Sequence, residues 1–359
     1  MAEGRRVVVA RFGETPLEAI AEHASLEPMA RPDVASLAPV DVVVAIRSAH
    51  VNWVDLLMTS GQYQHMAKPP YTPGLEYAGE VVDVGAAVRR VKVGDRVLVD
   101  GLLAGPRSLG AYQAYGGFAT WGVAPEEAIH PIPGSLGFDE AACLLGSYET
   151  AYHCLVARGR LAAGETVLVH GASGSTGLAA VQVAKLLGAT VIATGRSEKK
   201  LEVVKAQGAD HVLPSTGFKD RVKELTSGAG VDVVYDGVGG DVSVESLRCV
   251  KFGARFLIVG WAATPFVARG QGGRGAPNAN VLPTNLVMMK GLDVLGCPTV
   301  ISTVMNPAIR APRLAAVLEW ANRGAIRPHV SHTFALGDYR AAMQAKWAGE
   351  VVGSAVLHA

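Results

Sequence analysis

The feature that most constrains the fold is a glycine-rich turn in the segment VLVHGASGSTGLAAVQVAKLLGATVIATGRSEKK, residues 167–200. An apolar strand leads into the turn, a helix of small residues follows it, and a second strand ends at Gly195. A strand, a crossover helix and a second strand form a βαβ unit, in which the two strands run parallel. The sequence therefore predicts a parallel sheet with helices packed on it.

Strand and helix patterns continue to alternate after this unit. In order come SEKKLEVVKAQG, DHVLP, FKDRVKELTSG, VDVVYDG, DVSVESLRCV, ARFLIVG and LDVLGC, and helical segments between Phe138 and Arg158 precede the unit. Ser197 is a suitable N-cap and Gly208 a suitable stop for the first of these helices. Such alternation predicts a doubly wound α/β sheet with crossover helices on both faces.

The beginning and the end of the chain differ from this middle part. Short apolar runs bounded by Gly, Pro or Asp predict strands in RRVVVARF, PVDVVVAIRSAHVN, EYAGEVVDVG, VKVGDRVLVD and GGFATWGVA. Near the C-terminus, PRLAAVLEWANRG and SHTFALGDYRAAMQAKWAG predict two helices, and VVGSAVLHA predicts a final strand. A chain of 359 residues suits two domains of ordinary size, with a ligand cleft expected between them.

Composition excludes several classes of partner. Lys and Arg number 33 against 32 for Asp and Glu, so no basic field is present to collect nucleic acid. The N-terminus lacks the apolar core of a signal peptide and no run is long enough to span a bilayer, so we expect a cytoplasmic protein. The segment 264–283 is rich in Gly, Pro and Asn and predicts a flexible loop rather than an RNA-binding tract. Four scattered cysteines without a C-x-x-C pair predict small buried side chains, not a zinc site or a disulfide framework.

The spacing Ala172-x-Gly174-x-x-Gly177 resembles a dinucleotide fingerprint with alanine in the first position. Gly174 lets a pyrophosphate approach the backbone, Gly177 lets the helix pack close to its strand, and the helix N-terminus attracts the phosphates. A purely structural turn is the alternative, but the position between strand and helix favours nucleotide binding.

A cation, Arg196, follows the second strand. An acidic residue at this position would bind the ribose 2′-hydroxyl of NADH. Arg196, Ser197 and Lys200 instead offer donors to a 2′-phosphate, which favours NADPH. The alternative is a solvated, charged helix start, and Glu198 weakens the positive field.

Taken in order, VNWVDLLMTSGQY, PGLEYAGEVVDVG, VGDRV, HGASGSTG, VDVVYDGVGG, ARFLIVG and LVMMKGLDVLG resemble the zinc-independent NADPH:quinone oxidoreductase (ζ-crystallin) branch of the medium-chain dehydrogenase/reductase superfamily. The resemblance implies a GroES-like β domain formed by residues 1–133 and 308–359, and a Rossmann NADPH-binding domain formed by residues 134–307. It also implies a homodimer joined along sheet edges, with GLDVLG as the edge strand. The implied activity is NADPH-dependent reduction of quinones or related conjugated carbonyl compounds.

The departures from the zinc-dependent branch concern the metal. Asn52 stands where that branch has its catalytic cysteine, and Leu75 stands where it has a ligand histidine. Glu76 remains, but a carboxylate without thiolate and imidazole does not make a tetrahedral zinc site, so no metal is expected. Without a Lewis acid, reduction of a conjugated acceptor is more accessible than alcohol oxidation.

The resemblance also implies site residues. Asn52 and Tyr63 match residues beside the nicotinamide and are the expected catalytic residues. Each also has a purely structural alternative: Asn52 could cap a turn, and Tyr63 could pack on a loop. The expected cofactor-binding residues are Asn52, Thr150, Gly174, Ser175, Thr176, Gly177, Arg196, Ser197, Lys200, Val259, Gly260 and Trp261. His50 stands where a small residue is common and is expected to narrow the pocket.

Two other functions stay open at this point. An enone or enoyl-thioester reductase on the same fold would use the same cofactor. A nucleotide-occupied protein of the crystallin or RNA-binding type would bind it without turnover, although the near-neutral charge disfavours RNA.

Overall fold

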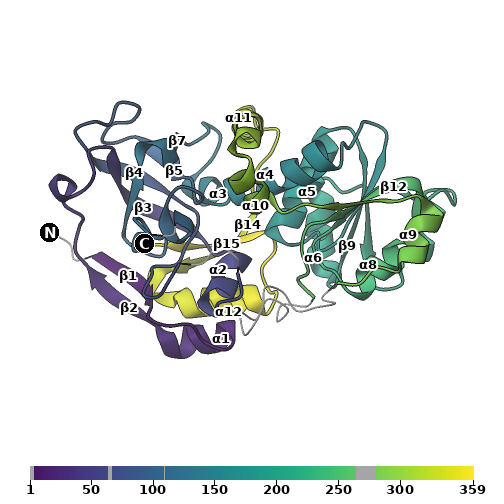
Figure 1. Cartoon of the computed structure of the whole chain (residues 1–359), viewed down its shortest axis with the longest axis horizontal. Coiled ribbons are helices and arrows are strands. Elements are labelled where there is room, and N and C mark those ends of the chain that lie inside the picture. The colour runs from purple at the N-terminus through teal and green to yellow at the C-terminus, as the bar shows by residue number, and fades with distance from the viewer. Residues whose placement is uncertain (1–3, 64–66, 109, 264–279) are drawn as a thin grey trace. The chain divides into compact units, whose positions relative to one another are not determined.

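The computed structural model describes residues 4–63, 67–108, 110–263 and 280–359, which form two compact units (Figure 1). Of the described residues, unit 1 comprises 4–146 and 327–359, and unit 2 comprises 147–263 and 280–326. Both limits lie further along the chain than the expected domain boundaries at 133 and 307. Most of the loop expected over residues 264–283 lies outside the described residues.

Unit 1 is built on a seven-stranded sheet and a separate antiparallel pair. The sheet has the order β14-β15-β3-β4-β5-β7, with β6 paired to β3. Its strands are β3 (Asp41–His50), β4 (Tyr77–Val84), β5 (Arg96–Val99), β6 (Trp121–Pro125), β7 (Ile129–Pro131), β14 (Val330–Ala335) and β15 (Ser354–His358), and the pair is β1 (Gly4–Val9) with β2 (Ala24–Met29). The predicted strands of the N-terminal part are therefore present, and β3 is buried almost throughout, with several of its side chains in the core of unit 1.

The helices of unit 1 are short. They are α1 (Pro16–Glu18), α2 (Trp53–Thr59), α3 (Phe138–Ala142) and α12 (Tyr339–Trp347). The helix predicted over SHTFALGDYRAAMQAKWAG is wrong in its first half, because residues 330–335 form β14 beside β15. Side chains along β14 alternate between half-buried and exposed, which is a strand period that the following helix pattern concealed.

Unit 2 contains a six-stranded sheet in which every pairing is parallel. The order is β10-β9-β8-β11-β12-β13. The strands are β8 (Thr166–Val169), β9 (Thr190–Gly195), β10 (His211–Pro214), β11 (Val231–Asp236), β12 (Val250–Ile258) and β13 (Asp293–Gly296). The strand order reverses next to β8, as in the dinucleotide-binding fold, and this confirms the predicted doubly wound sheet.

Helices connect successive strands of this sheet (Figure 1). The connecting helices are α5 (Ser175–Leu186), α6 (Glu198–Ala206), α7 (Phe218–Leu225), α8 (Asp241–Ser246) and α9 (Thr284–Lys290). Before β8 comes α4 (Leu145–Tyr152) with its continuation η5 (His153–Arg158), and after β13 come α10 (Thr299–Met305) and α11 (Arg310–Asn322). The α6 helix begins after Ser197 and is followed by Gly208 in the left-handed region, as the sequence predicts.

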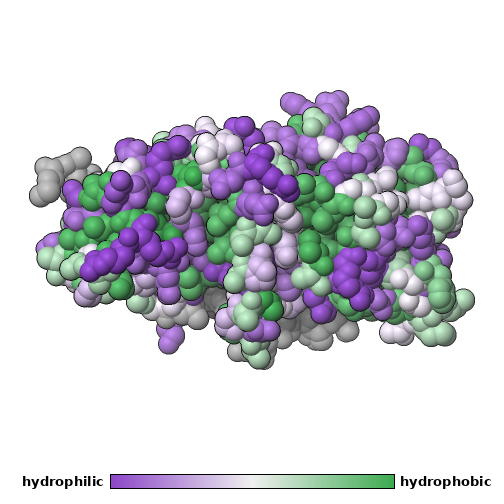
Figure 2. All heavy atoms as spheres, turned by 90° about the horizontal axis from the view of Figure 1, so that it is seen from above, coloured by the Kyte–Doolittle hydropathy of each residue, from purple (hydrophilic) through white to green (hydrophobic). Residues whose placement is uncertain are grey.

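Cysteines and the surface agree with the composition. All four cysteines are buried and free, which confirms the interpretation as small buried side chains. Figure 2 shows apolar side chains in several separate places among hydrophilic ones. No helix in the described part of the chain is long and apolar enough to cross a bilayer.

Candidate active site

The Glu76 carboxylate is the centre of a buried polar cluster in unit 1. Glu76 lies just before β4 and is 4% exposed. Its Oε2 accepts hydrogen bonds from Asn52 Nδ2 at 3.1 Å and faces His50 Nδ1 at 3.2 Å, and its Oε1 accepts one from the backbone N–H of Gly146. The carboxylate thereby connects the end of β3, the start of α2 and the start of α4.

Burial sets the protonation states in this cluster. Burial lowers the pKa of His50, which outweighs the opposing effect of Glu76. Burial by itself raises the pKa of the Glu76 carboxyl, but the hydrogen bonds from His50 and Gly146, with the charge of Arg107, hold it below its ordinary value. We therefore assign an ionised Glu76 and a neutral His50 that donates its Nδ1–H to the carboxylate.

Asn52 has a structural role as well as a position in this cluster. Its Oδ1 accepts from the backbone N–H of Val54 at 3.5 Å, and its own backbone N–H donates to Asp55 Oδ2 at 3.0 Å, which makes a reciprocal cap at the start of α2. Its amide nitrogen donates to Glu76 and carries a second hydrogen. The side chain is half-buried, and its hydrogen bonds with Val54 and Glu76 hold it in one orientation.

Asp55 holds the turn before Glu76. Its Oδ1 accepts from the backbone N–H groups of Gly74 and Leu75 at 3.0 and 3.1 Å, and the side chain is 1% exposed. Burial raises the pKa of the Asp55 carboxyl to about 7, against the opposing hydrogen bonds of the backbone. The aspartate of the V-N-x-x-D segment is therefore a positioning residue that places α2 against the PGLE turn.

Tyr63 lies beside an arginine that sequence reasoning missed. The Arg107 Nη2 donates to the Tyr63 hydroxyl at 3.3 Å, and the guanidinium lies 5.6 Å from the ring centroid. Tyr63 is half-buried and packs against the core of unit 1. Arg107 therefore fixes the position of the Tyr63 hydroxyl at the surface of this core.

The glycine-rich turn of unit 2 has the geometry of a phosphate cradle. Gly171 has a φ of +64°, and a Cβ on Gly177 would lie 2.3 Å from the Gly171 carbonyl oxygen, so α5 needs glycine there to pack this close. At Gly174 the nearest atom to such a Cβ is 3.5 Å away, and the residue is exposed. The backbone N–H groups at the start of the twelve-residue α5 follow directly, with Ser175 and Thr176 half-buried.

The remaining predicted cofactor residues of unit 2 lie on several elements. Arg196 is exposed directly after β9, and the Ser197 side chain makes no capping bond to α6 although it occupies the N-cap. Lys200 is half-buried on α6. Val259 and Gly260 follow β12, where both backbone N–H groups donate to the Asp236 carbonyl, and Trp261 is 42% exposed. Thr150 is half-buried on α4.

Parallel strands end at one edge of their sheet, so the residues that follow β8, β9 and β12 gather along the same edge of unit 2. This edge, with its glycine cradle and the donors after β9, fits a dinucleotide. The expected cleft between the two domains, and the meeting of Asn52 and Tyr63 with this edge, stay predictions.

Two residues that support this edge were missed by sequence reasoning. The buried His170 bridges Thr194 Oγ1 and Ser246 Oγ, each at 2.7 Å, and burial lowers its pKa to about 4. The buried Asp236 accepts from the backbone N–H groups of Val238 and Gly239 at 2.8 and 2.9 Å and from Ser243 Oγ. Both polar residues stand at the ends of apolar strands, and that position is the only sequence signal for them.

The donor set of unit 1 does not fit a catalytic zinc ion. Asn52 and Leu75 replace the thiolate and imidazole, and the His50 and Glu76 side chains are hydrogen-bonded to each other. Among the described residues, one group of three possible metal ligands has its ligand atoms within 4.8 Å of one another. It consists of Glu18, at the end of α1, with Glu22 and His23. There Arg11 donates to His23 Nδ1 at 3.2 Å, so one ring nitrogen of this histidine already has a partner within the chain.

Comparison with known proteins identifies the class. Residues 38–134 match the model of the alcohol dehydrogenase GroES-like domain, and residues 175–311 match the model named zinc-binding dehydrogenase. A quinone oxidoreductase-like protein 2 homolog of Nematostella vectensis is 34% identical over 87% of this chain and 80% of its own length. The Bos taurus quinone oxidoreductase-like protein 2 is 34% identical over 83% of this chain and 79% of its own.

Solved structures agree in fold. A probable oxidoreductase from Mycobacterium abscessus has a TM-score of 0.81 at 30% identity, with full coverage of both chains. A mycobacterial protein complexed with NADPH has a TM-score of 0.78 at 26% identity, covering 99% of this chain and all of its own. An NAD-dependent alcohol dehydrogenase has a TM-score of 0.79 at 27% identity over 99% of each chain.

The fold and the glycine cradle define a nicotinamide-dependent oxidoreductase built from a GroES-like and a Rossmann domain. The chain belongs to the quinone oxidoreductase family within the medium-chain dehydrogenase/reductase superfamily.

Glu76→Gln should destabilise unit 1 in a pH-dependent way. Loss of the charged acceptor should cost roughly 1–3 kcal/mol at neutral pH, because His50, Asn52 and Gly146 keep their buried donors. The folded pKa of Glu76 is lower than the ordinary 4.5, so its charge contributes stability above that value and loses the contribution as the pH falls through the folded pKa. Urea unfolding should therefore show a difference from the parent protein that shrinks between about pH 5 and pH 3.

Glu80→Gln is the matched control. Glu80 pairs with Arg47 at 2.8 Å on the surface, where both side chains are more than one third exposed. Its loss should change the free energy of unfolding by less than about 1 kcal/mol. Equal effects of the two substitutions would contradict the central role of Glu76.

Proposed function

We propose that this oxidoreductase uses NADPH to reduce quinones or related conjugated carbonyl compounds by hydride transfer, without a metal. The observation that carries the cofactor choice is the exposed Arg196 with Ser197 at the end of β9. A carboxylate at this place would repel a 2′-phosphate, whereas a guanidinium and a hydroxyl without a capping bond are suitable donors to it.

The chain supplies binding and orientation. The nicotinamide, when bound, supplies the hydride. The cradle at Gly174 and the start of α5 hold the pyrophosphate by backbone N–H groups. The amide of Asn52, fixed by Glu76 and by the α2 cap, presents its second N–H to a carbonyl oxygen, which gains negative charge during reduction. Tyr63, beside Arg107, donates the proton that completes the reduction.

The charge of Glu76 gives Asn52 a fixed direction. An amide that caps a helix through its oxygen and donates to a carboxylate through one N–H cannot exchange the two ends of its side chain without losing both bonds. The remaining donor is therefore preorganised, which is the property that stabilises charge in a transition state. The conjugated acceptor delocalises the incoming charge, so one such donor is sufficient in place of a metal ion.

The exposed edge of unit 2 suits a second copy of the chain. The β13 strand is the end of its sheet, and neighbouring apolar side chains are exposed; these are Met288, Met289, Val294, Ile301, Val304 and Met305. Unpaired strand edges bordered by apolar residues favour pairing with another chain. We accordingly expect a cytoplasmic homodimer joined at β13.

Light scattering of the parent protein should give twice the chain mass of 37.4 kDa. Val294→Lys places a charge on the edge strand and should give the mass of a monomer. The control Val93→Lys, at an exposed valine of unit 1, should leave the dimer intact. A monomeric parent protein would contradict the dimer.

Arg196→Gln should weaken binding of NADPH more than binding of NADH. Loss of a charge-assisted bond to the 2′-phosphate should raise the dissociation constant of NADPH at least about tenfold. NADH lacks that phosphate, so its dissociation constant should change by less than about threefold. Fluorescence titration measures both constants. Lys205→Gln, at the far end of α6, is the control. Equal losses for the two cofactors would remove Arg196 from the phosphate site.

A substrate panel tests the reaction. With NADPH, a naphthoquinone should be reduced faster than a crotonyl thioester, as followed by loss of NADPH absorbance. The reverse order would favour an enone or enoyl-thioester reductase. No oxidation of NADPH by any quinone or enone would favour a nucleotide-binding protein without turnover.

Asn52→Ser separates catalysis from capping within the same assay. Serine keeps an oxygen that caps α2 but lacks the amide donor. The variant should lose about a hundredfold in kcat for the quinone. It should also lose roughly 1–3 kcal/mol of stability, because the buried Glu76 loses one donor. Asn52→Ala should lose similar activity and about 1 kcal/mol more of stability than Asn52→Ser, because it also lacks the cap. An unchanged rate for both variants would leave Asn52 with the cap alone.

A further inference from the structure

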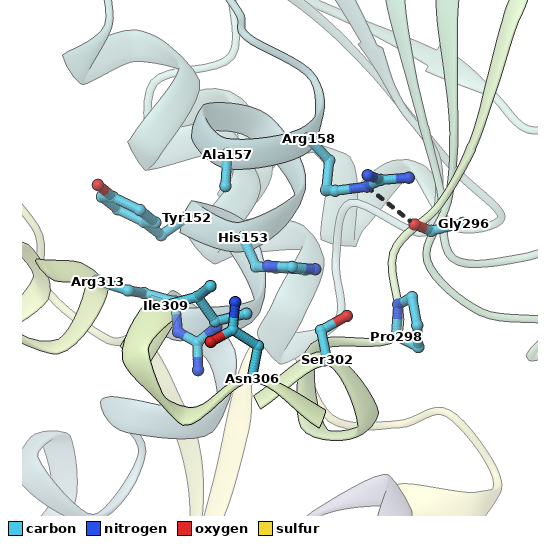
Figure 3. Close-up of a pocket in the computed structure, with 10 residues that line it drawn as sticks. All are labelled: Tyr152, His153, Ala157, Arg158, Gly296, Pro298, Ser302, Asn306, Ile309 and Arg313. Carbon is cyan, nitrogen blue, oxygen red and sulfur yellow. Dashed lines mark hydrogen bonds between the residues drawn. The ribbon is translucent and has the colours of Figure 1, made fainter. Parts of the chain in front are cut away.

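Unit 2 contains a cavity of about 500 Å³ beyond the edge strand β13. One wall comes from α4 and its continuation η5, which contribute Tyr152, His153, Ala157 and Arg158 (Figure 3). The other comes from the end of β13 and from the segment that runs through α10 to α11, with Ser302, Asn306 and Arg313. The cavity is therefore formed within one unit, by elements that the sheet edge holds together.

Two buried nitrogen atoms at this cavity have no hydrogen-bond partner in the described part of the chain. They are His153 Nε2 and Arg313 Nη1, on side chains that are 4% and 1% exposed. The other nitrogens of Arg313 are used, since Nε donates to Glu149 Oε2 at 2.8 Å and Nη2 donates to Thr303 Oγ1 at 2.7 Å. A buried guanidinium N–H without an acceptor is costly, so its presence at a cavity indicates an acceptor that binds there.

The charges around the cavity are predominantly positive. Glu149 accepts hydrogen bonds from both Arg310 and Arg313, so one carboxylate faces two guanidinium groups. Arg158 adds a third at the rim, where its Nε donates to the Gly296 carbonyl at 3.2 Å (Figure 3). Burial, with the charges of Arg313 and Arg158, lowers the pKa of His153 to about 4, so the imidazole is neutral near pH 7 and adds a hydrogen-bonding group without charge.

The remaining walls set the size and polarity of the ligand. Ala157, Pro298 and Ile309 are apolar, and the Tyr152 ring lies on the same side as Ala157. A bare inorganic ion would leave these walls without contacts, whereas an apolar chain or ring would cover them. A single anionic group is enough for the buried Nη1–H of Arg313, and the positive charge of Arg158 at the rim favours its approach.

The cavity lies apart from the phosphate cradle. The cradle follows β8 and the cavity adjoins β13, with β11 and β12 between them, a separation of about 14 Å across three strand spacings. Ligands at the two places are therefore different molecules or distant groups of one molecule.

We propose that this cavity is a binding site for a small organic carboxylate, whose anionic group contacts Arg313, whose approach the charge of Arg158 at the rim favours, and whose apolar body lies against Ala157, Pro298 and Ile309. The site is additional to the nicotinamide site and does not depend on the proposed substrate.

Calorimetry with hexanoate as the probe tests the proposal on the full chain. Hexanoate should bind, and hexanamide, its neutral counterpart, should bind at least about tenfold more weakly, because it lacks the charge that two guanidinium groups attract. Ser302→Asp places a carboxylate inside the cavity and should weaken hexanoate at least about tenfold by like-charge repulsion. Arg158→Gln should weaken it as well, through loss of the rim cation.

Arg160→Gln is the matched control, because Arg160 is a neighbouring exposed arginine that pairs with Asp293 at 3.5 Å and does not line the cavity. It should leave hexanoate binding unchanged, and so should Arg196→Gln, which separates this test from that of the cofactor site. The proposal is overturned if hexanamide binds as well as hexanoate, or if Arg160→Gln weakens hexanoate as much as Arg158→Gln does. It is also overturned if inorganic phosphate binds at this cavity and hexanoate does not.

Discussion

The interaction on which unit 1 depends is the satisfaction of one buried carboxylate. Removing Glu76 from water is unfavourable unless donors surround it, and the fold provides them from His50, Asn52 and Gly146. These donors belong to the end of a strand, the cap of a helix and the start of another helix. Holding the charge therefore fixes three elements, and the same bonds orient the amide that we assign to catalysis.

Unit 2 meets a different constraint with backbone rather than charge. Its parallel strands end at one edge, where the chain has to turn sharply after β8 and still leave backbone N–H groups for a ligand. The Gly171 and Gly177 geometry accomplishes the turn, while His170 and Asp236 anchor the neighbouring loops by buried hydrogen bonds. Function at this edge thus rests on close packing that tolerates little change.

The two proposed ligand sites of unit 2 use charge in different ways. Arg196 is exposed, so in the proposed role it would meet a ligand phosphate in solvent and affect the choice between two cofactors. Arg313 is buried and ion-paired, so its remaining N–H acts in a region of low dielectric, where one hydrogen bond carries more weight. The difference follows from their elements, a strand end for Arg196 and the inner face of a helix for Arg313.

Sequence by itself determined the elements with strong local periods. The parallel strands, the turn at Gly174 and the cation at Arg196 follow from residue type and spacing, because neighbours in the chain decide them. The replacement of metal ligands by Asn52 and Leu75 is implied by the resemblance to the family. Local pattern failed at β14, where the strand is defined by pairing with β15 and the adjacent helix signal was stronger. Tertiary structure alone decided that Glu76 gathers His50, Asn52 and Gly146, that Arg107 lies over Tyr63, and that His153 and Arg313 line one cavity. These partners are far apart in sequence, and only packing determines which distant side chains share a buried volume.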